Sequence, residues 1–155
     1  MEDTEGVCKM KDIKMPENVK MILDKLSSEE HEAVIIGGCV RDSIMGIEPH
    51  DWDIATSAQP EEIMECFKKY NLMKAGLKHG TVTVIIDHEP YEITTYRIDG
   101  EYSDHRRPDS VDFTCNLAED IMRRDFTINA IAYDGENIID LHDGIGDLQK
   151  GIIRC

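Results

Sequence analysis

Two aspartates separated by one residue, Asp51 and Asp53, are the first side chains in this sequence whose spacing suggests chemistry. Alternate residues of a β-strand point to the same face, so a strand over residues 51–55 would present both carboxylates together. Neighbouring carboxylates repel each other unless a cation lies between them, and Mg²⁺ prefers such oxygen ligands. The pair therefore predicts a magnesium site, although two aspartates at this spacing also arise by chance in an acidic chain.

Glu92 is the candidate for a third carboxylate. Residues 81–87 and 91–98 are rich in β-branched and aromatic side chains and are separated by a short polar link, which is typical of a hairpin. Glu92, Thr94 and Tyr96 would share one face of the second strand. A third carboxylate on a neighbouring strand would complete a two-metal site, which holds the attacking and leaving oxygens of an in-line displacement. The alternative is an exposed glutamate paired with a lysine or arginine.

A glycine turn before the aspartates suggests a site for an anion. Gly37 and Gly38 follow the apolar run Ala33–Ile36 and precede a short predicted helix at residues 40–45. Glycine lets the backbone approach a phosphate closely, and the start of a helix offers free N–H groups. Arg41 can add charge-assisted hydrogen bonds to a triphosphate. Most glycine pairs are only turns, but the aspartate pair that begins ten residues after Arg41 favours the anion site.

A second polar group contains Arg124, Asp125 and Asn129. In a helix, Asp125 and Asn129 would be neighbours on one face. Arg124 would then neutralise triphosphate charge, while Asp125 or Asn129 would orient the triphosphate or contact the sugar. The alternative is a surface Arg–Asp pair followed by a helix-capping asparagine.

His105, Arg106 and Arg107 form the other basic cluster, in a predicted mobile loop at residues 99–110. This cluster would guide a primer end or shape a nucleotide pocket as the loop closes. Solvated loop charge is the alternative interpretation.

The elements that must position these groups alternate between helix and strand. A helix beginning at Pro16 would bury Val19, Ile22, Leu23 and Leu26 on one face. Ser57 and Glu61 resemble a helix-capping pair, with Pro60 in the first turn. The remaining expected elements are a loose lead-in at 1–15, strands at 33–36, 51–55, 138–141 and 152–154, a helix reaching about residue 70, and a helix at 117–132 broken near 124–127. Together they predict one α+β domain over residues 16–155.

Composition limits the class of protein. The chain has 155 residues, of which 41% are hydrophobic, so it can form one ordinary domain with a core. It has no apolar run of the roughly 18 residues that a membrane span needs, and residues 1–6 do not resemble a signal peptide. We therefore expect a cytoplasmic protein without membrane contact. The five cysteines are scattered and form no C-x-x-C pair, which predicts neither a disulfide framework nor a zinc site.

The net charge of −15 bears on partners. Proteins that grip a nucleic-acid backbone are usually basic, so this chain would hold a large RNA weakly by itself. It could still act on a nucleic-acid end if metal ions supply the positive charge. The alternative is that acidity only keeps the domain soluble.

Four ordered motifs resemble those of the CCA-adding tRNA nucleotidyltransferases, a family whose signature the bacterial poly(A) polymerases share. They are Gly37-Gly38-Cys39-Val40-Arg41-Asp42 with His50-Asp51-Trp52-Asp53-Ile54-Ala55-Thr56; Glu92-Ile93-Thr94-Thr95-Tyr96-Arg97; Gly100-Glu101-Tyr102-Ser103-Asp104-His105-Arg106-Arg107-Pro108; and Arg123-Arg124-Asp125-Phe126-Thr127-Ile128-Asn129-Ala130. The resemblance covers residues 33–155. Its order and spacing are more specific than any one of the motifs.

The resemblance implies a palm-type nucleotidyltransferase fold, with a mostly antiparallel or mixed sheet flanked by helices. It implies Mg²⁺ as the cofactor, bound by Asp51 and Asp53, with Glu92 as the third carboxylate. Gly38, Arg41 and Arg124 would contact the triphosphate of CTP or ATP. The expected reaction is template-independent transfer of CMP and AMP to a tRNA 3′ end.

The chain departs from this family in length. Family members continue into neck, body and tail regions, and the neck carries the residues that select the base. We therefore expect a catalytic-head fragment, or a chain that works with a protein partner. Poly(A) addition is the alternative product, and a module that binds nucleotide without turnover is the alternative class.

Overall fold

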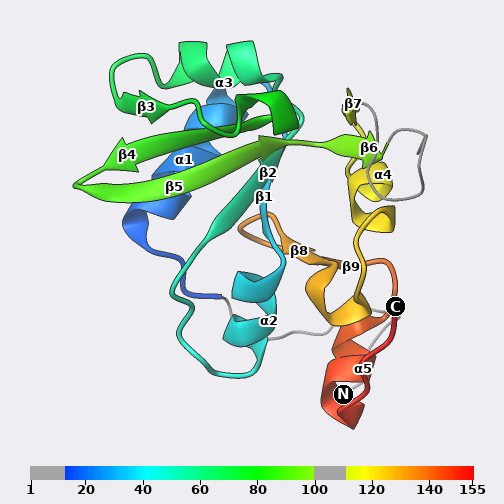
Figure 1. Ribbon diagram of the computed structural model, residues 1–155. Coiled ribbons are helices and arrows are strands. Elements are labelled where there is room, and N and C mark those ends of the chain that lie inside the picture. The colour runs from blue at the N-terminus through cyan, green and yellow to red at the C-terminus, as the bar shows by residue number, and fades with distance from the viewer. Residues whose placement is uncertain (1–12, 100–110) are drawn as a thin grey trace.

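The computed structural model describes residues 13–99 and 111–155. Figure 1 shows their helices and strands in chain order. These are α1 (Glu17–Ser28), β1 (Ala33–Ile36), α2 (Gly38–Ile44), β2 (Asp53–Thr56), α3 (Pro60–Cys66), β3 (Asn71–Met73), η1 (Leu77–His79), β4 (Thr81–Ile86), β5 (Glu89–Thr95), β6 (Arg97–Asp99), β7 (Val111–Phe113), α4 (Leu117–Met122), η2 (Thr127–Asn129), β8 (Ile131–Tyr133), β9 (Ile138–Asp140) and α5 (Gly144–Lys150), with η for a 3₁₀ helix.

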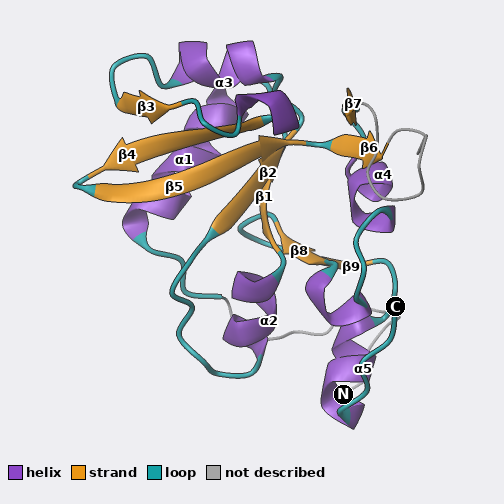
Figure 2. Cartoon of the chain, viewed as in Figure 1, coloured by secondary structure: helices purple, strands orange, loops and turns teal. Residues whose placement is uncertain are grey.

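A seven-stranded sheet in the order β3-β4-β5-β2-β1-β8-β9 forms the framework. Every pair of neighbours in it is antiparallel except β2 and β5, which run parallel. β6 and β7 form a separate two-stranded ribbon. Figure 2 shows this mixed arrangement of strands and flanking helices, so the predicted α+β class is confirmed.

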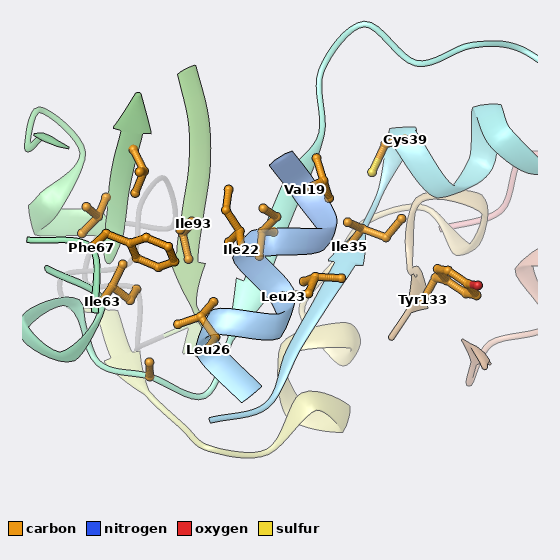
Figure 3. Packing of buried hydrophobic residues seen from close by; sticks show 14 of the residues in the cluster. Val19, Ile22, Leu23, Leu26, Ile35, Cys39, Ile63, Phe67, Ile93 and Tyr133 are labelled. Carbon is orange, nitrogen blue, oxygen red and sulfur yellow. The ribbon is translucent and has the colours of Figure 1, made fainter. Parts of the chain in front are cut away.

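The main core lies between one face of the sheet and the helices α1 and α3. α1 buries Val19, Ile22, Leu23 and Leu26, as the sequence pattern predicts. Figure 3 shows these side chains among those of the sheet and of α3. A smaller cluster covers the opposite face, where Tyr96 and Ile121 pack against alanines and aliphatic side chains of the sheet. One face of the sheet is therefore covered by α1 and α3, and the opposite face carries the smaller cluster.

The hairpin of β4 and β5 is confirmed, with a two-residue turn at Asp87 and His88. Both turn residues have positive φ, at 52° and 66°, which is the conformation that matches the twist of paired strands. The predicted second strand continued to residue 98, but it ends at Thr95. The segment Arg97–Asp99 leaves the main sheet and pairs with β7 instead.

Three other expectations differ from the structure. Residues 117–132 do break where expected, but after the break Ile131–Tyr133 is a strand, because β1 offers it a ladder partner. Residues 152–154 are not a strand, and the expected polar turn before them is the helix α5. Asp140 accepts the N–H groups of Gly144 and Ile145 at 2.7 and 2.9 Å and so satisfies donors at the start of this helix.

The start of α3 also differs in detail. Gln59 and Glu62 form its capping box, and the Ser57 hydroxyl instead accepts the backbone N–H of Glu32 at 2.9 Å. Pro60 does occupy the first turn, as expected, but the helix ends at Cys66 and not near residue 70. Within the described part of the chain, no helix is long and apolar enough to cross a membrane.

Replacing Ile22 with alanine should lower the free energy of unfolding by about 2–5 kcal/mol, because this side chain is fully buried under the sheet. Lys20→Ala, an exposed change on the same helix, should alter it by less than about 0.5 kcal/mol. Urea unfolding followed by circular dichroism measures both values. Equal midpoints for the two variants would contradict the packing of α1.

Candidate active site

The parallel ladder between β2 and β5 brings two of the three candidate carboxylates together. Asp53 is the direct partner of Glu92, one strand away. Side chains at paired positions share a face of the sheet, and both residues are exposed. The next pair, Ile54 and Ile93, is buried on the face that α1 and α3 cover. Asp53 and Glu92 therefore lie side by side on the opposite, accessible face.

Asp51 lies outside β2, so the expected strand over residues 51–55 is wrong at its start. Two features of the sheet explain this difference. β1 ends at Ile36, before the Gly37 turn, and the β5 residue opposite Asp51 in this register is Pro90, which has no N–H to donate. Asp51 is exposed in the loop that enters β2, and its charge still acts on Asp53.

The groups around Asp53 shift the pKa of its carboxyl in opposite directions. Protein atoms surround part of its carboxyl although the residue remains accessible to solvent, and this desolvation is the largest cause of its raised pKa. The Arg124 guanidinium lowers the pKa, and the Asp51 carboxylate raises it. Within residues 13–99 and 111–155, no three or more acidic, histidine or cysteine side chains are gathered closely enough to hold a metal ion. Asp53 adjoins Glu92 across the ladder and is acted on by the Asp51 charge, and we refer to these three residues as the carboxylate patch.

The glycine turn lies at the same edge of the sheet. Gly37 has φ of 90° and is buried, and its N–H donates to the Ile131 carbonyl at the start of β8. Its own carbonyl accepts the N–H groups of Val40 and Arg41 at 3.1 Å, which begins α2. A side chain at Gly38 would meet the Arg41 guanidinium at 3.4 Å. That distance is an ordinary van der Waals contact, and it shows that Arg41 folds back over the turn.

Arg41 is anchored by two residues, one of them distant in sequence. Its Nη1 donates to Asn129 Oδ1 at 2.7 Å, and its Nε and Nη2 reach Asp42 Oδ1 at 3.1 and 3.0 Å. The sequence suggested that Asn129 contacts a nucleotide, and the structure shows that it fixes Arg41. Residues 41 and 129 meet because η2 packs beside α2.

Arg124 sits on a different anchor, Asp120 of α4. The Arg124 Nε and Nη2 donate to Asp120 Oδ2 at 3.2 and 3.0 Å. Asp125 does not share a helix face with Asn129, because residues 123–126 form a loop between α4 and η2. Asp125 is exposed in that loop. Sequence reasoning did not single out Asp120, although an aspartate three and four residues before two arginines is a helical ion-pair spacing.

The basic cluster of His105, Arg106 and Arg107 lies outside the described residues. Cys39 is buried next to the backbone of Asp53, and burial raises the pKa of its thiol to about 11. Cys39, Cys66, Cys115 and Cys155 are free thiols, which agrees with the expected lack of disulfides among these four residues.

Solved structures share this architecture. The CCA-adding enzyme of Bacillus stearothermophilus in complex with CTP aligns with a TM-score of 0.80 and 38% identity, over 91% of this chain and 34% of that one. The Thermotoga maritima CCA-adding enzyme complexed with tRNA aligns with a TM-score of 0.70 and 25% identity, over 93% and 35% of the two chains. The fold is therefore that of a nucleotidyltransferase head domain.

Sequence comparison gives the family. The Poly A polymerase head domain matches residues 33–154, and the chain belongs to that family. The CCA-adding enzymes of Lactobacillus johnsonii and Oceanobacillus iheyensis are 53% and 54% identical to it over 135 and 134 residues. Each alignment covers 86% of this chain and 33% of the relative. The chain thus spans about one third of the length of the curated relatives that it matches.

Replacing Asp53 with asparagine should raise the thermal unfolding temperature at pH 7. A raised pKa means that the folded protein binds the Asp53 proton more tightly than the unfolded chain does. The stability that this proton binding adds is fully present below pH 3.8, the ordinary pKa of an aspartate, and is lost as the pH rises through the folded pKa. At neutral pH the ionised Asp53 carboxylate therefore opposes folding.

Calorimetric scans from pH 3 to pH 7 would measure this effect. The difference in unfolding temperature between Asp53→Asn and wild type should increase as the pH rises. If the carboxylate patch binds Mg²⁺, adding the ion should reduce this difference. Glu61→Gln, which changes an exposed carboxylate on α3, is the matched control. A variant less stable than wild type at pH 7 would contradict the charge balance described for Asp53.

Proposed function

We propose that this chain is the catalytic head of a CCA-adding enzyme, which transfers CMP and AMP from CTP and ATP to a tRNA 3′ end. The observation that carries the proposal is the pairing of Asp53 with Glu92 on the accessible face of the sheet, beside Asp51 and the Gly37 turn. The names of the relatives support it, as do solved relatives described as complexes with CTP, with tRNA, and with a primer tRNA and an ATP analogue.

The residues at the site fit a magnesium ion. Asp53 and Glu92 offer accessible carboxylate oxygens on adjacent strands, and Asp51 adds a third carboxylate on the entering loop. Mg²⁺ binds such oxygen ligands and typically keeps several waters, which suits an open patch better than a closed cage. When bound, it would lower the pKa of the attacking hydroxyl and stabilise charge on the transferring and leaving phosphates.

In the proposed reaction, the RNA 3′-hydroxyl attacks the α-phosphate of the nucleotide, a new phosphodiester forms, and pyrophosphate leaves. Arg41 and Arg124 would bind the triphosphate and neutralise charge that develops on it. Both guanidiniums are already held by protein partners, so little side-chain freedom is lost on binding. Gly38 would let the triphosphate approach the backbone, and Asp125 and Asn129 lie on the segment that would border the sugar. Catalysis would come mainly from placement and charge.

The acidity of the chain suggests that tRNA is gripped elsewhere. With a net charge of −15, this part of the protein would contact the RNA end and leave the stem to other regions or to a protein partner. Base selection would also lie in those regions. Poly(A) addition is the second candidate product, favoured by the description of the matching family. Either reaction fits the cytoplasmic location that the sequence predicts.

The direct test is incorporation of labelled CMP and AMP onto a tRNA that lacks its 3′ CCA, with Mg²⁺ present. Asp53→Ala and Asp51→Ala should each reduce product by at least about a hundredfold, because each removes a carboxylate that would hold the metal ion needed to stabilise the transition state. Both variants should keep the wild-type fold by circular dichroism. Glu61→Ala, an exposed change away from the site, should retain wild-type incorporation.

The nucleotide pattern separates the two products. Growth of the RNA with ATP alone would favour poly(A) addition, and a requirement for CTP before AMP would favour CCA addition. Calorimetric titration of CTP in the same buffer measures binding independently of turnover. Undiminished incorporation by both aspartate variants would contradict the proposed site.

A further inference from the structure

Asp120 is a buried carboxylate surrounded by donors from three other residues. Its residue is 1% exposed. Oδ1 accepts the Arg97 backbone N–H at 3.0 Å and the Arg123 Nε at 3.1 Å, and Oδ2 accepts the Arg124 Nε and Nη2. The bond to Arg97 ties the end of α4 to the start of β6. These contacts fix the Asp120 side chain from several directions.

The charges in this cluster do not balance. Among the described residues, the ion pairs of this cluster join one carboxylate to two guanidiniums, at positions i+3 and i+4 from Asp120, where α4 ends and the next loop begins. One arginine would be enough to neutralise a buried aspartate, so the second leaves a net positive charge near a surface patch of three carboxylates. The side chains of Arg123 and Arg124 are only 15% and 22% exposed, so solvent screens this charge incompletely.

Arg124 lies between two acidic groups. The edge that carries its Nε and Nη2 faces Asp120, which leaves the Nη1 side for another group. Its charge also acts on Asp53. A guanidinium without the Asp120 contacts would be free to pair directly with Asp53 or Asp51 and would occupy oxygens that a metal ion needs.

We propose that Asp120 is a positioning residue that holds Arg124 back from the carboxylate patch and oriented toward the nucleotide triphosphate. This inference rests on the proposed function, since it assigns the triphosphate to Arg124. Asp120 itself touches neither substrate nor metal. Its effect on nucleotide and Mg²⁺ binding therefore passes through Arg124, and that dependence can be measured.

The experiment is a double-mutant cycle on the whole chain, read by calorimetric titration of CTP with Mg²⁺. Asp120→Asn should weaken CTP binding by about 10- to 100-fold, the usual effect of losing a residue that orients a ligand group. Arg124→Ala should weaken it at least as much. Asp120→Asn added to Arg124→Ala should cause no further loss beyond about twofold, because the residue through which it acts is already gone.

A Mg²⁺ titration supplies a second readout that loss of packing alone would not move. At fixed CTP, Asp120→Asn should need more Mg²⁺ than wild type for half-maximal binding. The same substitution in the Arg124→Ala background should leave the Mg²⁺ requirement of that background unchanged, since no guanidinium remains to compete for the carboxylates.

Two controls separate positioning from folding. Glu119→Gln changes the adjacent carboxylate of α4, which accepts the Thr114 hydroxyl, and should bind CTP like wild type. In an Arg123→Ala background, Asp120→Asn should still weaken binding, because Arg124 remains. If the Asp120→Asn variant does not fold, the cycle is repeated in an Arg123→Gln background. The Arg123→Gln change removes one of the two guanidiniums that lose their carboxylate partner. Thermal unfolding checks each variant.

The possible outcomes distinguish the role of Asp120 from the proposed function of the chain. CTP binding that is weakened by Arg124→Ala and unaffected by Asp120→Asn would overturn the role of Asp120 and leave the proposed function standing. An equal loss from Asp120→Asn with and without Arg124 would also overturn that role, as a general structural effect. No CTP binding by folded wild type would overturn the proposed function together with the inference built on it.

Discussion

The parallel pairing of β2 with β5, in a sheet whose other neighbours are antiparallel, is the constraint on which the site depends. Parallel neighbours need a long crossover, and here α3, β3 and β4 supply it. β3 and β4 extend the sheet on the other side of β5, and the start of β2 lies beside the middle of β5. Asp53 thus meets Glu92 from a strand end, where the preceding loop can bring Asp51 to the same patch.

That arrangement concentrates negative charge, and the rest of the site offsets it. Asp53 has a raised pKa even with Arg124 nearby, which indicates that the patch opposes folding in the absence of a cation. The two candidate arginines each have a polar anchor, Asn129 for Arg41 and Asp120 for Arg124. The charge of Arg124 acts on Asp53 while its Nε and Nη2 remain bonded to Asp120. For the function proposed above, this arrangement would offer accessible anions to a metal ion and fixed cations to a triphosphate.

Local patterns predicted much of the framework, and long-range contacts explain what they missed. The helix α1 could be predicted because its apolar spacing is long and regular, and the β4–β5 hairpin because both strands and the turn are local. Ile131–Tyr133 is too short to reveal a strand without its partner β1, almost a hundred residues earlier. The glycines of α5 suggested a turn, since their packing was unknown. Asp53 and Glu92 were visible by type, but their register and the Arg41–Asn129 bond were not.

The glycines of α5 have a structural reason that also bears on the site. A side chain at Gly144 would collide with the Thr127 carbonyl, so glycine allows α5 to pack directly on η2. Asp147, which is 5% exposed, accepts the Thr127 hydroxyl at 2.6 Å, and the Thr127 N–H donates to the Arg154 carbonyl. These contacts fix the start of η2, while Asn129 at its end bonds to Arg41. The position of Arg41 therefore depends on the packing of α5 against η2, so a segment that carries none of the candidate catalytic residues still constrains the site.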